Sequence, residues 1–152
     1  MSQDGLLPLS DNVGYVLKQA ATALHVAMEN ALRPCGLTLS QYSCLEHLSR
    51  DPGQTNAQLA RGMFVTPQSM NDVLRGLQRR GLVERPAEAR SGRSQPTHLT
   101  PEGAQLVDAA RAALEPVETA LAELTARPEH AHLLESLRAA IRTLGTEGDD
   151  AR

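Results

Sequence analysis

Apolar residues recur every three or four positions along most of the chain, which is the spacing of one face of an α-helix. This period predicts a first helix over about 11–33 and a second over about 40–50. Asp11 or Ser10 is expected to cap the first helix and Ser40 the second, because short polar side chains accept hydrogen bonds from the first helical amides. The start of the chain is therefore predicted to be helical.

Shorter elements are expected in the middle of the chain. Thr55 is a suitable cap for a third helix, and Thr66, with Pro67 in the next position, for a fourth. After Gly81 the pattern alternates between apolar and polar residues, as in strands. The expected order is a fourth helix over 66–80, a strand over 82–85, a polar, turn-rich segment over 86–96 and a returning strand over 97–99.

Two helices are expected after this segment. Thr100 caps a long one, which Pro116 is expected to kink because an interior proline removes a hydrogen bond and clashes with the preceding turn. Pro128 opens the last helix. The first and last helices carry more apolar surface than the middle of the chain can cover, which predicts a two-fold dimer. A closed monomeric bundle is the alternative.

Composition agrees with a single helical domain spanning 1–152. Hydrophobic residues make up 41% of the 152 residues and aromatic residues only 2%. No apolar run approaches the roughly 18 residues of a membrane span, and the first residues do not resemble a signal peptide. Two cysteines are too few for a disulfide framework, which favours a cytoplasmic protein.

The net charge of -3 hides an asymmetry. Between Thr55 and Thr100 there are seven arginines and three carboxylates, so the rest of the chain is acidic. A basic segment on an acidic body suits contact with phosphates. A solvated arginine-rich surface is the alternative interpretation.

The middle segment has the elements that a protein needs to read DNA. Two helices joined by a short turn, followed by a basic hairpin, place a helix in the major groove and a loop in the minor groove. The fourth helix begins with short polar side chains that can approach base edges. The hairpin tip has Arg90 and Arg93 beside Gly92, and arginine is favoured in a narrow minor groove. The polar residues of the helix start are Thr66, Gln68, Ser69 and Asn71.

These segments together resemble the multiple-antibiotic-resistance regulator (MarR) family of winged helix-turn-helix transcription factors. The resemblance covers about Asp11 to Leu144. It is carried by the segments Leu39–Tyr42, Asn56–Ala60, Val65–Asn71, Leu77–Val83 and Leu99–Gly103. It implies a mainly α fold with a small β-hairpin wing, in which a winged helix-turn-helix lobe (38–101) lies between dimerisation helices (11–34 and 103–145). Members are typically homodimers that bind palindromic operators and release DNA when a small molecule or an oxidant acts on them.

The resemblance also implies site residues. Helix 66–80 would enter the major groove and wing 86–96 the minor groove, with Arg93 at the wing tip. Ser91 stands where most relatives have an aspartate that orients this arginine, and Asp72 where many have an arginine. Arg75 lies one turn further on, and Thr55 and Asn56 lie near phosphates. The predicted DNA-binding residues are Thr55, Asn56, Thr66, Gln68, Ser69, Asn71, Arg75, Arg90, Ser91 and Arg93.

An effector pocket is implied between the DNA-binding lobe and the dimer helices. The residues predicted to line it are Leu24, Met28, Tyr42, Leu45 and His47, together with the start of the long helix. Apolar walls with a few polar groups fit a small lipophilic or aromatic acid. An ordinary core position is the alternative for Met28 and Leu45.

Other kinds of control are less well supported. Cys35 follows a helix end near Arg33 and is the candidate for redox sensing, whereas Cys44 is expected to be buried. Glu29, Cys35, Glu46 and His47 could supply metal ligands near one another, but zinc-responsive members of the family also use histidines of the long helix, and this chain has none between Gly103 and Arg127. No metal or other cofactor is therefore expected.

The sequence predicts a ligand- or stress-responsive repressor that acts on double-stranded DNA in the nucleoid. It has no glycine-rich phosphate loop, nucleophile elbow or zinc-protease motif, so it is not expected to be an enzyme. A protein-interaction module with a degenerate wing, or a cysteine-based redox-sensing regulator, is the alternative function.

Overall fold

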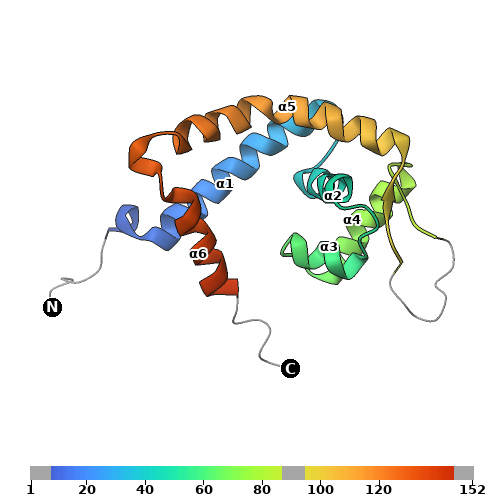
Figure 1. Ribbon diagram of the computed structural model, residues 1–152, viewed down its shortest axis with the longest axis horizontal. Helices are drawn as coiled ribbons and strands as arrows, with labels where there is room; N and C mark the ends of the chain where they lie inside the picture. The colour runs from blue at the N-terminus through green and yellow to red at the C-terminus, as the bar shows by residue number, and fades with distance from the viewer. Residues whose placement is uncertain (1–7, 87–94, 146–152) are drawn as a thin grey trace, which may run out of the picture. The chain divides into compact units, whose positions relative to one another are not determined.

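A computed structural model of the chain describes residues 8–86 and 95–145. The chain divides into two compact units, Met1–Leu114 and Glu115–Arg152. The elements, in chain order, are α1 (Val13–Leu32), α2 (Leu39–Arg50), α3 (Asn56–Gly62), α4 (Pro67–Arg79), β1 (Val83–Glu84), β2 (His98–Leu99), α5 (Pro101–Thr125) and α6 (Leu133–Gly145), with short 3-10 turns at Leu9–Asp11, Arg33–Cys35 and Pro128–His130 (Figure 1). The predicted fold class, mainly α with a small hairpin, is confirmed. The predicted single domain stays a prediction.

Two predicted helix caps are wrong. Asn12 caps α1 in place of Asp11 or Ser10, and Thr38 caps α2 in place of Ser40. A capping residue has an extended backbone and precedes the first helical residue, whereas Ser40 already lies inside its helix. Both helices thus begin where a side-chain oxygen can accept a hydrogen bond from the first turn.

The helices around the connection between α3 and α4 begin and end as predicted. Thr55 caps α3 and Thr66 caps α4 through their side chains. After α4, the Leu82 amide donates a 3.0 Å hydrogen bond to the Leu77 carbonyl, and Gly81 has φ +70°. This is a Schellman motif, which only a residue tolerant of the left-handed region closes without strain.

One apolar core holds the first unit together. Helix α4 contributes Met70, Leu74 and Leu77, which are fully buried, whereas Val73 is only half-buried. The spacing of four and then three residues places the buried side chains on one stripe, and Val73 lies at its edge. The buried apolar residues are Leu32, Leu37, Cys44, Leu45, Leu48, Leu59, Ala60, Met70, Leu74, Leu77, Leu82, Val83, Val107, Ala110 and Leu114.

The strands form the predicted antiparallel hairpin. Val83 lies opposite Leu99 and Glu84 opposite His98. A separate bridge between Gln54 and Thr97 attaches the second strand to the segment that precedes α3. The start of the second strand is thereby attached to the helical lobe.

Helix α5 begins very close to the start of this hairpin. The Thr100 amide donates to the Leu82 carbonyl at 3.1 Å, and the Thr100 hydroxyl donates to the Gly81 carbonyl at 2.7 Å. The same hydroxyl accepts from the Gly103 amide at 3.1 Å and so caps α5. A Cβ atom added to Gly103 would lie 2.0 Å from the Leu82 carbonyl oxygen. Only glycine permits this approach.

An ion-pair network joins α5 to α2. The Arg111 guanidinium donates to Glu46 at 2.9 Å and to Ser49 at 2.8 Å, and Arg50 donates to the other oxygen of Glu46. Burial acts to raise the pKa of Glu46, but the hydrogen bonds from Arg50 and Arg111 outweigh it and lower the pKa below its ordinary value. The charged form of Glu46 therefore stabilises the folded state.

This network predicts a pH-dependent loss of stability. Because the pKa of Glu46 is lower in the folded chain, its contribution is fully present above 4.5, the ordinary glutamate pKa, and is lost as pH falls through the lower folded value. Glu46→Gln should lower the urea midpoint at neutral pH, with a difference from the wild type that shrinks in acid. Exposed Glu118→Gln is the control, and an equal difference at every pH would contradict the prediction.

The second unit exposes apolar side chains. Helix α5 continues through Pro116 to Thr125 without a break in the helix. In α6, the exposed fractions are 53% for Leu134 and Ile141 and 74% for Leu144. In the two described stretches of the chain, no helix is both long and apolar enough to cross a membrane.

Candidate nucleic-acid interface and effector cavity

A tight turn joins α3 to α4. Its central residue, Phe64, has φ +56° and is 77% exposed. This left-handed conformation is uncommon for a bulky side chain and normally suits glycine. The Asn56 side chain donates to the Pro67 carbonyl at 3.1 Å and so ties the first turn of α3 to the first turn of α4. The angle between the helices is therefore held at two places.

The outer face of α4 carries two of the residues predicted to contact DNA, Gln68 and Arg75. Gln68, Asp72, Arg75 and Arg79 are exposed, and they follow one another at spacings of three or four residues, so they share a face. The core side chains lie on the opposite side of the helix. Arg79, four residues after Arg75, shares this exposed face but was not among the contacts predicted from the sequence.

The polar residues at the start of α4 have structural roles as well. The Thr66 hydroxyl accepts from the Ser69 amide at 3.1 Å and bonds the Ser69 hydroxyl at 2.9 Å. Gln68 is exposed and has no such tie, and Asn71 is half-buried. The helix start is thus pre-formed by its own polar side chains, and the Gln68 side chain lies exposed beside them.

The remaining predicted contacts fall into two groups. Thr55 caps α3, and both polar atoms of the Asn56 side chain face the protein, since its oxygen is buried. These two residues therefore act on the geometry of the lobe. The predicted wing contacts Arg90, Ser91 and Arg93 lie outside the described residues.

A cavity of about 360 Å³ lies beside this lobe. Its walls come from α1, α2, the end of α3 and the turn that leads into α4. The residues that line it are His25, Leu39, Ser40, Ser43, His47, Gly62, Met63 and Val65. Apolar side chains, two hydroxyls and two imidazoles suit a small, partly polar molecule.

This cavity differs from the predicted pocket. Of the five predicted residues, only His47 lines it. Leu45 is fully buried in the core, Met28 and Tyr42 pack against the core, and Leu24 is half-buried. Sequence reasoning missed the cavity serines, although positions 40, 43 and 47 recur along one face of α2.

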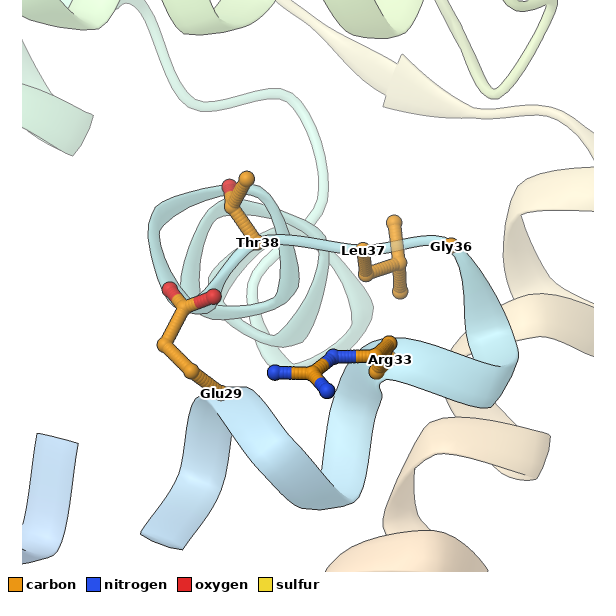
Figure 2. A pocket seen from close by; sticks show the side chains of 5 residues that line it. All are labelled: Glu29, Arg33, Gly36, Leu37 and Thr38. Atoms are coloured by element: carbon orange, nitrogen blue, oxygen red, sulfur yellow. The ribbon is translucent and has the colours of Figure 1, made fainter. Parts of the chain in front are cut away.

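A smaller pocket of about 230 Å³ lies where α1 leads into α2. Figure 2 shows that Glu29 directs its carboxylate toward the start of α2. There it accepts a 2.7 Å hydrogen bond from the Leu39 amide. Arg33, which also lines the pocket, donates to Asn30 at 2.9 Å. The charged groups of this pocket thus serve the helix ends, which makes the larger cavity the better candidate for a ligand.

The two cysteines differ in their surroundings. Burial raises the pKa of the Cys44 thiol to about 12, and the charge of Arg85 offsets only part of this effect. Cys35 is half-buried, and the nearby Arg33 guanidinium is bonded to Asn30. Within 8–86 and 95–145, no three potential metal ligands gather in one place, and Glu46 is taken up by its arginine partners.

These surroundings predict different thiol reactivities. In the folded protein at neutral pH, iodoacetamide should modify Cys35 while Cys44 stays unmodified, because the thiolate is the nucleophile and burial suppresses it. Both thiols should react in urea. Cys35 and Cys44 lie in one tryptic peptide, because no lysine or arginine stands between them. Tandem mass spectrometry of that peptide assigns the label to each thiol, and equal labelling of the folded chain would contradict the burial of Cys44.

Comparison with known proteins shows which family this chain resembles. A model of the MarR family matches residues 36–94. The chain is 44% identical to the HTH-type transcriptional repressor Rv2887 of Mycobacterium tuberculosis over 128 residues, which are 82% of this chain and 92% of that protein.

Solved structures give the same result. A complex of Rv2887 with DNA has a TM-score of 0.67 at 34% identity and covers 85% of this chain and 97% of that one. A complex of Rv2887 with salicylic acid has a TM-score of 0.64 at 38% identity and covers 86% and 98%. CouR from Rhodococcus jostii RHA1, bound to p-coumaroyl-CoA, has a TM-score of 0.76 at 25% identity and covers 91% and 95%.

The likeness extends far beyond the two helices and hairpin that first suggested a DNA reader. It includes 92% of a curated repressor and nearly the full length of its solved structures. We conclude that this chain belongs to the MarR family of transcriptional regulators.

Proposed function

We propose that this protein is a homodimeric transcriptional repressor that binds a palindromic operator and releases it when a small aromatic carboxylic acid binds. Helix α4 enters the major groove and the wing, residues 86–96, the minor groove. The observation that carries the proposal is the exposed face of α4, where Gln68, Arg75 and Arg79 line up opposite a fully buried apolar stripe. The relative Rv2887 has been solved with DNA, which supports it.

The dimer follows from the apolar residues that the chain leaves exposed. Leu134, Ile141 and Leu144 repeat along one side of α6, and Val13 and Val16 are exposed at the start of α1. Surfaces of this kind are normally covered, and a two-fold partner covers them with the same surface. Two recognition helices then read the two halves of a palindrome.

The effector class follows from the cavity beside the α3–α4 turn. Its volume of about 360 Å³ admits a single aromatic ring with a carboxylate. Rv2887 has been solved with salicylic acid. Because Gly62, Met63 and Val65 line the cavity just before the cap of α4, a bound ligand would displace this turn and with it the recognition helix.

The test is binding to the DNA upstream of the protein's own gene, measured by fluorescence anisotropy at several salt concentrations. Affinity should fall steeply with salt, because each neutralised phosphate releases counterions. Gln68→Ala should weaken binding by about 1–3 kcal/mol and relax specificity, while Arg75→Ala should reduce the salt slope by about one. Arg93→Ala tests the wing and should also cost about 1–3 kcal/mol.

The exposed Gln105→Ala of α5 is the matched control and should leave the affinity unchanged. Flat salt dependence with equal affinities for all variants would favour a protein-interaction module over a DNA-binding repressor.

A repressor of this kind acts on the chromosome in the cytoplasm. It catalyses no reaction, because its function consists of two binding equilibria, one with DNA and one with the effector.

A further inference from the structure

Two imidazoles line the effector cavity together. His25 comes from α1 and His47 from α2, and the hydroxyls of Ser40 and Ser43 lie on the same walls. No other titratable side chain of the described residues lines this cavity. A carboxylate that enters it therefore meets two groups that can gain a proton, and no group with a permanent positive charge.

His47 occupies the more informative position. Its ring lies over the last residue of α3, since a Cβ atom added to Gly62 would be 3.1 Å from the His47 Cε1 atom and 3.4 Å from Nδ1. It also lies in the last turn of α2. Positive charge is favoured at the C-terminal ends of helices.

The charges around His47 can be assigned helix by helix. Several charged or titratable residues lie near the cavity-lining positions in the sequence of the same helices. They are His25 and Glu29 of α1, Glu46 and Arg50 of α2, Asp51 just after α2, and Arg61 of α3. Glu46 is paired with Arg50 and Arg111. Glu29 lies 3.8 Å from His25 and so already offers that ring a negative partner. Among the described residues His47 has no ion-pair partner, so a ligand carboxylate supplies the one it lacks.

We infer that His47 takes up one proton from solvent when a carboxylate binds in this cavity and gives it back when the ligand leaves. The inference rests on the proposed effector site and adds its pH dependence. A neighbouring carboxylate favours the charged form of an imidazole, and an imidazole in water titrates near pH 6.5. Effector binding, and with it the release of DNA, is then stronger in mild acid than in mild alkali.

The experiment is isothermal titration of salicylate into the full chain across the imidazole range. Affinity should weaken by up to about 20-fold between about pH 6 and pH 8, because one proton is coupled to binding. Repeating the titration in buffers of different ionisation enthalpy counts the protons directly. Salicylamide, which has the same ring and no carboxylate, should bind without this dependence.

Variants assign the proton. His47→Gln should remove most of the pH dependence of salicylate binding. His132→Gln is the matched control, since His132 is an exposed histidine 3.8 Å from a glutamate on α6, and it should behave as wild type.

Each outcome separates the inference from the proposed function. Salicylate binding with no proton uptake, or an unchanged pH dependence in His47→Gln, would overturn the inference and leave the effector site standing. No salicylate binding at any pH would overturn both the effector site and its proton coupling. Operator binding, measured independently, decides whether the repressor assignment itself holds.

Discussion

Gly103→Ala is expected to destabilise the protein by about 3 kcal/mol or more, which is the upper range for overpacking a buried site. The added methyl group would lie 2.0 Å from the Leu82 carbonyl oxygen, a backbone atom that cannot rotate away. This carbonyl also accepts the hydrogen bond from Thr100. Relieving the clash therefore separates α5 from the base of the wing, and both stability and operator affinity should fall. Urea denaturation followed by circular dichroism measures the change.

Gly76→Ala provides a matched control with the opposite sign. Gly76 lies inside α4, and its added Cβ would meet only the Gln41 side chain at 3.9 Å, an ordinary contact. Alanine in a helix interior is favoured over glycine by about 0.5–1 kcal/mol, so this variant should be slightly more stable than the wild type. A Gly103→Ala protein as stable as Gly76→Ala would show that α5 and the hairpin do not approach as closely as the structure indicates.

Replacing Leu134 and Ile141 together by aspartate is expected to give a monomer that has lost about 100-fold or more in operator affinity. Both side chains are 53% exposed in the single chain, and both lie on the side of α6 proposed to meet the partner. Covering such a side chain is worth about 1.5–3 kcal/mol, whereas burying an unpaired carboxylate opposes association. Losing the second recognition helix removes the gain in affinity that comes from linked half-sites.

Light scattering coupled to size-exclusion chromatography gives the oligomeric state, and anisotropy gives the operator affinity. His132→Asp with Ser136→Asp adds the same number of carboxylates to exposed polar positions of the same region and should remain dimeric. If the Leu134 and Ile141 variant were still a dimer with full affinity, this side of α6 would not be the interface.

Local signals explain why most of the lobe could be predicted from the sequence. Thr55, Thr66 and Gly81 act within one helical turn of themselves, so residue type and position were enough to identify two caps and a helix end. The two strands of the hairpin were predicted from the alternation of apolar and polar residues. The caps of α1 and α2 could not be chosen correctly, because several suitable residues stand together and only the first helical residue decides between them.

The effector cavity was harder to predict because it depends on packing. Leu45 was predicted from the sequence to line the effector pocket, yet the neighbouring helices bury it completely. Met63 and Val65 belong to a turn, and their approach to Ser43 and His47 depends on how α3 packs under α2. The close approach of Gly103 to Leu82 likewise joins residues far apart in the sequence, so a glycine in the family pattern could be noticed but its reason could not.

The bond from Asn56 to the Pro67 carbonyl has a consequence for how such lobes diversify. Because that bond aligns the two helices independently of the connecting residues, Phe64 is tolerated in a conformation that costs an L-amino acid roughly 1–2 kcal/mol. The turn between the helices therefore does not require glycine at position 64. Other residues can replace the exposed Phe64 without changing the orientation of α4.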